Sequence, residues 1–154
     1  MDNLTDAIAT EDARDSSIVD SGADTAPVPN AMVKVPGPAG GMFEIDTTEV
    51  TQEQYADFLA RGTTSVAQPP ECSTNTSFTP HDFFTPQTTP ASPVVMIDWC
   101  DAHAYCTWVG KRLCGGVGGA PGAFANSSDP TKNEWLWACT KGGVQDYPYG
   151  AIEQ

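Results

Sequence analysis

The feature that most restricts the fold is a long stretch, residues 63–92, without helical or strand periodicity. Thr, Pro and Ser dominate it, and the segment FTPHDFF at residues 78–84 supplies apolar side chains that can anchor it. Loops of this length are uncommon inside compact domains, and they are usually functional or held down by contacts. We therefore expect a domain with little regular secondary structure.

A helix is predicted directly before this loop, in the segment EVTQEQYADFLARG. Thr51 can cap it, and Gln54 stands at the third helical position, which is the capping-box pattern. Gly62 is expected to end the helix in the left-handed conformation. Three apolar residues recur at helical spacing and predict the buried face: Tyr55, Phe58 and Leu59.

A buried strand and a second helix are predicted after the loop, in PVVMIDWCDAHAYCTWVG. The strand covers residues 94–97, Asp98 caps the helix, and Gly110 ends it. The helical spacing predicts a buried face of Trp99, Ala102, Cys106 and Val109. Lys111 and Arg112 follow the helix, where its dipole stabilises cations by roughly 0.3–1 kcal/mol. The helix dipole therefore explains the position of these two cations without an active site.

The remaining elements are a hairpin near the N-terminus and a third helix near the C-terminus. Two short strands flank a Pro-Gly turn between Met32 and Ile45. The segment PTKNEWLWACTKGG predicts a helix with Thr131 as its cap and Glu134 completing a capping box. Residues 114–129 form a glycine-rich loop between the second and third helices. The pattern predicts the α+β class.

Charge and composition exclude several kinds of partner. The net charge is −13, and like charges repel nucleic acid and anionic membranes. No apolar run approaches the roughly 18 residues of a membrane span. Residues 1–31 contain seven of the 20 acids and no aromatic residue, which predicts a disordered acidic linker. Residues 32–154 then form the domain.

The five cysteines indicate an oxidising compartment, so we expect a secreted, periplasmic or surface-tethered protein. Five is an odd number, so at least one thiol is unpaired within the chain. Cys100, His103 and Cys106 are residue types that bind zinc. On one helix, however, the outer two lie about 9 Å apart along the axis, so one zinc ion cannot easily bind all three. The spacing of the histidines and cysteines does not pair any histidine with a thiol that it could activate as a catalytic base. The acidic residues at the starts of the helices stand where caps stand, so they do not indicate an acid–base pair.

At the level of motifs, the sequence resembles the first half of the formylglycine-generating enzyme (sulfatase-modifying factor) family. The resemblance covers about residues 32–150 and rests on four segments in the family's order: VPGPAGGMFEIDTTEVTQEQYADFL, PVVMIDWCDAHAYCTWVGKRL, NEWLWACTKGG and YPYG. It implies an α+β fold related to C-type lectins. It also implies a parent reaction in which copper and oxygen oxidise a cysteine of a sulfatase peptide to formylglycine.

The resemblance also implies what lies outside these residues. The family's copper-binding cysteine pair, its calcium loops and most of its substrate groove are expected beyond Gln154, so the domain is expected to be incomplete at its C-terminus. Cys106 and Cys139 would pair with cysteines of that missing half. No catalytic, cofactor-binding or metal-binding residue is assigned within the chain, which is expected to be inactive alone.

The sequence departs from the family pattern at two places. The opening motif and the first helix are fused, and residues 114–129 are inserted where many members run from GKRL directly into PTEAEW. One alternative remains open, a non-catalytic C-type-lectin-like module that binds peptide or glycan. An iron-dependent relative would require a histidine-rich motif, and none is visible. A cysteine pair in a family-like C-terminal half would favour the enzyme.

Overall fold

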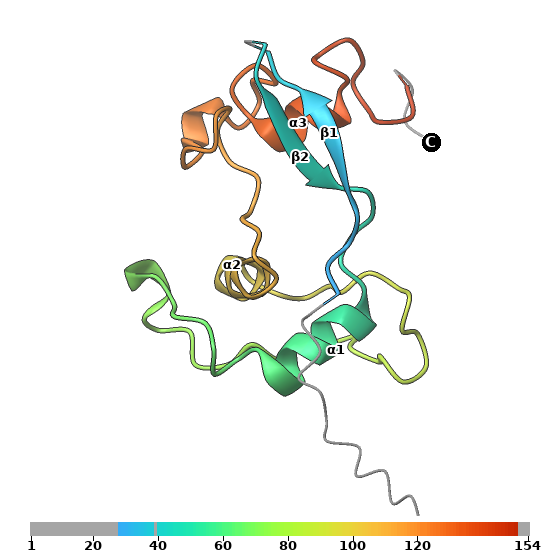
Figure 1. Ribbon diagram of the computed structural model, residues 1–154, viewed down its shortest axis with the longest axis vertical. Coiled ribbons are helices and arrows are strands. Elements are labelled where there is room, and N and C mark those ends of the chain that lie inside the picture. The colour runs from blue at the N-terminus through green and yellow to red at the C-terminus, as the bar shows by residue number, and fades with distance from the viewer. Residues whose placement is uncertain (1–27, 39, 151–154) are drawn as a thin grey trace, which may run out of the picture.

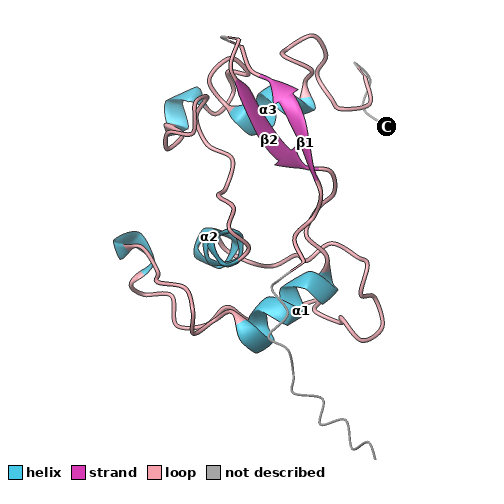
Figure 2. Cartoon of the chain, in the orientation of Figure 1, coloured by secondary structure: helices cyan, strands magenta, loops and turns pink. Residues whose placement is uncertain are grey.

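The computed structural model describes residues 28–38 and 40–150 (Figure 1). Most of the predicted linker, residues 1–27, lies outside the described residues. In chain order the elements are β1 (Met32–Pro36), β2 (Met42–Asp46), α1 (Gln52–Arg61), η1 (Pro70–Cys72), α2 (Trp99–Trp108), η2 (Phe124–Asn126) and α3 (Glu134–Cys139). This mixture confirms the α+β class, and loops occupy much of the described chain (Figure 2).

The elements are arranged in two regions. Helices α1 and α2 lie together at one end with the long loop, and we call residues 47–110 the helical region (Figure 1). The β1–β2 hairpin lies beside α3 at the other end, and we call residues 28–46 and 111–150 the hairpin region. The chain passes between the two regions after β2 and again after α2.

The hairpin has the two strands that the sequence predicts. β1 and β2 are antiparallel, with Val33 opposite Ile45 and Val35 opposite Phe43. The Gly37 N–H donates to the Gly41 carbonyl over 2.7 Å and closes the turn. The pairing thus begins close to the turn, as a short connection requires.

Helix α1 forms as predicted. Thr51 is the N-cap, and the reciprocal bonds with Gln54 complete the capping box. Tyr55 and Phe58 are fully buried, and Leu59 packs against them. Apolar spacing and cap therefore determine this helix together.

The prediction for the end of α1 was wrong in its mechanism. Gly62 caps the helix, but its φ is −96°, a right-handed conformation. A Cβ at this position would lie 2.4 Å from a ring carbon of Phe58 and 2.9 Å from Trp108. Gly62 is thus required because the rings of Phe58 in α1 and Trp108 in α2 leave no room for a Cβ, and the left-handed stop is not used.

Helix α2 begins at the predicted cap, Asp98, and it buries only part of the predicted face: Cys106 and Val109 pack against the core. Ala104 and Tyr105 join Tyr55 and Phe58 in the core, whereas Trp99 is 55% exposed. Apolar residues occur on all sides of α2, so spacing alone could not select the buried face. Contact with the aromatic side chains of α1 selects it instead.

The predicted strand at residues 94–97 does not form. A single bridge joins Thr51 to Pro93, and the Val94 N–H donates to the Val50 carbonyl over 2.9 Å. Met96 has a positive φ of 60°, which interrupts an extended chain. The segment is therefore joined by its backbone to the residues just before α1 and does not continue as a strand.

The long loop is held down, as its apolar segment suggested. Phe78 and Phe84 pack against the core. The Tyr55 hydroxyl donates to the Phe78 carbonyl over 2.8 Å, and the Gln52 side chain accepts from the Thr85 N–H over 2.6 Å. The loop therefore belongs to the packed structure of the helical region.

The cap of α3 differs from the prediction. Asn133 is the N-cap, and its side-chain oxygen accepts from the Leu136 N–H over 3.0 Å. Thr131 instead donates to Asp129, and Glu134 is not part of a capping box because its carboxylate bonds to a distant arginine. Gly142 and Gly143 follow the end of α3 and both have positive φ.

Candidate functional site

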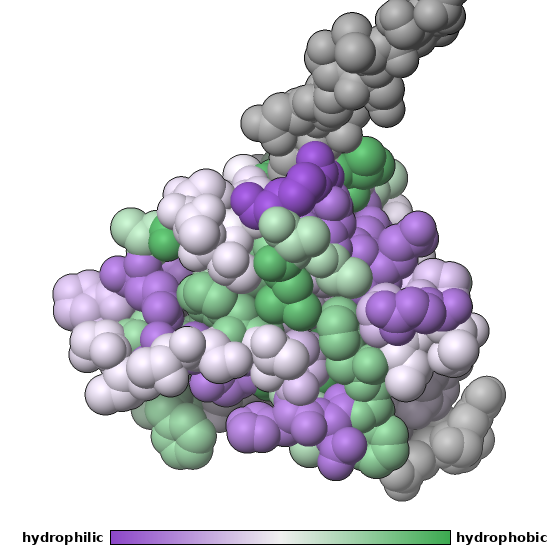
Figure 3. Space-filling view, turned by 90° about the horizontal axis from the view of Figure 1, so that it is seen from below, coloured by the Kyte–Doolittle hydropathy of each residue, from purple (hydrophilic) through white to green (hydrophobic). Residues whose placement is uncertain are grey.

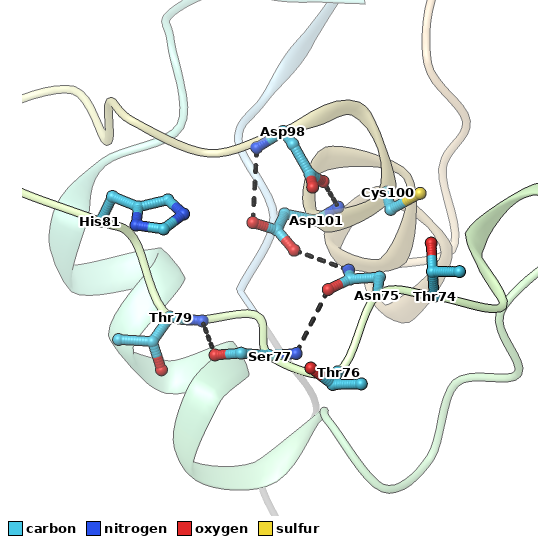
Figure 4. Close-up of a pocket in the computed structure, with 9 residues that line it drawn as sticks. All are labelled: Thr74, Asn75, Thr76, Ser77, Thr79, His81, Asp98, Cys100 and Asp101. Carbon is cyan, nitrogen blue, oxygen red and sulfur yellow. Dashed lines mark hydrogen bonds between the residues drawn. The ribbon is translucent and has the colours of Figure 1, made fainter.

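A polar cavity of about 370 Å³ lies at the N-terminus of α2, between the helix and the loop before it (Figure 4). Hydroxyl, amide, imidazole and carboxylate groups converge on it. Its lining consists of Thr74, Asn75, Thr76, Ser77, Thr79, His81, Asp98, Cys100 and Asp101. No lysine or arginine contributes to this lining.

Two carboxylates fix the floor of the polar cavity. Asp98 accepts from the Asp101 N–H over 2.9 Å, and Asp101 accepts in return from the Asp98 N–H over 3.4 Å. Asp101 also accepts from the Asn75 side-chain amide over 2.9 Å, which joins the loop to the helix. Burial raises the pKa of Asp101, and the hydrogen bonds from Asn75 and Asp98 act against this rise.

A disulfide closes one side of the cavity. Cys72, in η1, is bonded to Cys100 in the first turn of α2. The sequence did not predict this pair, because the two residues are 28 positions apart and no pattern connects them. With its sulfur in a disulfide, Cys100 is unavailable as a thiolate ligand. The His103 ring packs against the Trp99 ring, with centroids 5.1 Å apart. Cys100, His103 and Cys106 therefore do not assemble a zinc site.

The cavity can accept and donate hydrogen bonds, but its groups do not form a catalytic arrangement. His81 is exposed and lies across the opening from Asp98 and Asp101 (Figure 4). The sulfur in the lining is oxidised, so His81 has no thiol there to activate as a base. The geometry suits a small polar ligand better than a reaction.

A second, larger groove of about 680 Å³ lies along the surface between α1 and α2. Tyr105 and Trp108 provide an apolar floor, while Glu53 and Asp57 lie on the α1 side. Asp57 already binds Arg61, one turn further along α1. The groove therefore combines aromatic surface with one acidic wall.

Lys111 and Arg112 bind specific carboxylates, and helix-dipole stabilisation alone does not explain their positions. The Lys111 ammonium lies 2.5 Å from an Asp46 oxygen at the end of β2 and also donates to the Asn30 carbonyl. The Arg112 guanidinium donates two hydrogen bonds, of 2.7 and 2.9 Å, to Glu134. These adjacent cations therefore connect the end of α2 to the hairpin and to α3.

Glu134 is the buried acceptor of this arrangement, with 1% of its surface exposed. It also accepts from the Gly115 N–H over 3.2 Å. The hydrogen bonds from Arg112 lower its pKa, although burial acts in the opposite direction. It is therefore a structural anion, and a proton-transfer role would require a raised pKa.

The three remaining cysteines are free thiols: Cys106, Cys114 and Cys139. Burial raises the pKa of Cys106 to about 11, and burial also raises the pKa of the other two. Among the described residues, no group of three or more His, Cys, Asp or Glu side chains is arranged to hold a metal ion. Burial thus disfavours, at each of these three cysteines, the thiolate form that a copper-binding cysteine pair needs.

Comparison with known proteins identifies the family. The sequence profile of the sulfatase-modifying factor enzyme 1-like domain matches residues 12–154. The chain therefore belongs to this family, as its four motifs predicted. A search of the solved structures gives no significant match.

Curated relatives include both active and inactive proteins. The chain is 40% identical over 63 residues to the formylglycine-generating enzyme of Bos taurus, which covers 40% of this chain and 12% of the relative. The same identity and length relate it to the formylglycine-generating enzyme of Thermomonospora curvata, of which 15% is covered. The inactive C-alpha-formylglycine-generating enzyme 2 of Bos taurus is 42% identical over 60 residues, covering 38% of this chain and 14% of the relative. The chain thus aligns with less than one sixth of each of these relatives.

Proposed function

We propose that the described residues are a non-catalytic, structural portion of a formylglycine-generating-type domain. The complete domain would oxidise a cysteine of a sulfatase-type peptide to formylglycine with copper and oxygen. The observation that carries this proposal is the similarity to relatives of both kinds. Identity is 40% to an active enzyme and 42% to an inactive one over nearly equal lengths. Residues that these relatives share at this level are expected to maintain the fold.

The chemistry of the cysteines supports the same assignment. Two of the five are joined in a disulfide, and burial favours the protonated form of the other three. Soft Cu(I) selects thiolate ligands, so thiols that burial keeps protonated are poor candidates for a tight site. We therefore assign copper and calcium binding to parts of the complete protein outside these residues.

The proposal extends to fold, compartment and partner. The mixed α+β structure with long loops is compatible with the C-type-lectin-like fold of the family. The Cys72–Cys100 disulfide supports folding in an extracytoplasmic, oxidising compartment. None of the helices in the described part of the chain has the length and apolar character that crossing a bilayer requires. The alternative of a lectin-like peptide- or glycan-binding module gains no support from the relatives' names.

A turnover assay tests the proposal. Residues 1–154 are incubated with copper, oxygen, a reductant and a Cys-x-Pro-x-Arg peptide, with an active relative as positive control. We expect the relative to produce the aldehyde, detected by mass, and the chain to produce none. Aldehyde production by the chain that is lost in Cys106→Ala or Cys139→Ala would place catalysis here and refute the structural role.

A further inference from the structure

The groove between α1 and α2 shares no lining residue with the polar cavity. Its volume of about 680 Å³ falls in the range of about 300–1,000 Å³ that is typical of ligand pockets. Its described lining contains the carboxylates of Glu53 and Asp57 and no lysine or arginine. A molecule that enters the groove therefore meets negative charge beside aromatic surface.

One acid of this groove has no counter-charge. Glu53, Asp57 and Arg61 follow one another at intervals of four residues, so they lie on one face of α1. Asp57 forms an ion pair with Arg61. The Glu53 side chain forms no ion pair or hydrogen bond with the described residues, and it is exposed. The face therefore carries a second carboxylate, one turn earlier, without a matching cation.

Arg61 shows that this surface can hold a guanidinium. Its Cζ lies 5.9 Å from the centroid of the Trp108 ring, which is within the distance of a cation–π interaction. The same guanidinium binds the Asp57 carboxylate. An aromatic ring and a carboxylate thus bind one cation at the end of the groove, and Glu53 offers a further carboxylate one turn away.

Tyr105 contributes a hydroxyl that lacks a partner. Tyr105 is 4% exposed and lines the groove, and its hydroxyl makes no hydrogen bond with the described residues. The oxygen still reaches the surface, because Gln68 has the only fully buried side-chain oxygen or nitrogen without a partner in the described part of the chain. Burial raises the pKa of Tyr105 to about 12, so the hydroxyl is protonated at neutral pH and its oxygen can accept a hydrogen bond.

We propose that this groove binds an arginine or lysine side chain of a partner polypeptide. The aliphatic stem of that side chain packs on the Trp108 ring, and its cationic head binds the Glu53 carboxylate with the Tyr105 oxygen as a second acceptor. The groove is larger than one such side chain requires, so neighbouring residues of the partner enter it as well. The net charge of −13 attracts a basic partner from a distance.

The charge of the groove disfavours other occupants. Residues 1–27 directly precede Val28, which lines the groove, but they contain seven acids and one basic residue. Like charges oppose the entry of such a segment beside Glu53, and they oppose an anionic ligand in the same way. A neutral apolar ligand would remove water from the Glu53 carboxylate without supplying a counter-charge.

An NMR titration tests the site on the whole chain. Isotope-labelled protein is titrated at low ionic strength with the peptide acetyl-Gly-Ala-Arg-Ala-Gly-amide, and separately with the same peptide carrying citrulline, the neutral analogue of arginine. We expect saturable shifts of the Trp108 indole N–H and of α1 amides, with a Kd of about 1 mM. The citrulline peptide should bind at least about tenfold more weakly. Equal affinities, shifts confined to other parts of the chain, or no saturable shift overturn the proposal.

Two conservative variants identify the groups that bind. Glu53→Gln removes the charge and should weaken binding about fivefold, and Tyr105→Phe removes the hydroxyl and should weaken it about threefold. The matched control is Glu71→Gln, which makes the same change of net charge at an exposed residue outside the groove and should leave the affinity unchanged. Unchanged affinity in either variant, or equal weakening by Glu53→Gln and Glu71→Gln, refutes the site. The peptide contains no cysteine, so the result is independent of the catalytic proposal.

Discussion

The helical and hairpin regions are held together by different interactions. In the helical region, the buried residues include Tyr55, Phe58, Ala104 and Tyr105. The rings of the three aromatic residues are in contact, with centroids 5.4–5.9 Å apart. In the described part of the hairpin region, the buried side chains are polar: Glu134 and Thr140. One region has an apolar core with a disulfide, whereas the other depends on ion pairs and hydrogen bonds.

The difference shows how each region can depend on further structure. The hairpin region leaves large apolar side chains exposed, among them Met42 at 60% and Trp135 at 58%. In the helical region, the face on the side of α1, seen from below, also mixes apolar with polar residues (Figure 3). An apolar core stabilises the helical region locally, and polar contacts alone contribute less. We therefore expect the hairpin region to be the less stable of the two.

The largest effect is expected from removing a core ring. Phe58→Ala should lower the free energy of unfolding by about 3–5 kcal/mol, because it deletes a fully buried aromatic side chain. Urea denaturation followed by near-ultraviolet circular dichroism measures the change. The matched control is Phe124→Ala, which removes a ring that is 93% exposed and should change stability by less than about 0.5 kcal/mol. Equal effects of the two substitutions would contradict the assignment of the core.

The disulfide is expected to have the next largest effect. Replacing Cys72 and Cys100 by serine should cost about 3.5 kcal/mol, since the bond closes a loop of 28 positions in the unfolded chain. The same urea experiment measures the loss. Cys106→Ser is the control, because it changes a thiol without opening a loop. A double variant as stable as the wild type would show that the disulfide does not stabilise the fold.

The sequence predicted local features well and contacts between distant residues poorly. The caps Thr51 and Asp98 are correct because each is read from its immediate neighbours. Part of the buried face of α2 and the partners of Lys111 and Arg112 were missed because they depend on which segments meet after folding. The polar cavity was missed for the same reason, since its lining comes from two separate segments.

The Arg112–Glu134 pair should give a smaller effect that depends on pH. Arg112→Met leaves the Glu134 carboxylate buried without its cation, and we expect a loss of about 2 kcal/mol at pH 7. In the wild type the pKa of Glu134 is lowered by folding, so its contribution is present above the unfolded pKa and is lost as pH falls through the folded pKa. Stability measured from pH 7 to pH 3 should therefore fall less in the variant.

A second substitution separates charge from packing. Adding Glu134→Leu to Arg112→Met removes the unpaired buried charge, so the double variant should recover part of the stability lost at pH 7. If the single variant is as stable as the wild type, or if its acid dependence is unchanged, Glu134 does not rely on Arg112.

The smallest effect is expected where the segment that leaves α2 attaches to the hairpin. Lys111→Met removes the ammonium that binds Asp46 and the Asn30 carbonyl, and both partners are in the hairpin region. The Lys111 side chain is 12% exposed, so we expect a loss of about 1 kcal/mol, confined to the attachment of the hairpin. Hydrogen exchange should become faster at the amides of β1 and β2 and stay unchanged in α1, because the aromatic core is not altered.

Lys132→Met is the matched control, since its pair with Asp129 is 3.3 Å long and solvent-exposed, and such pairs contribute little. Equally faster exchange in α1 and in the hairpin would show that the two regions unfold as one unit, and the distinction between them would then fail.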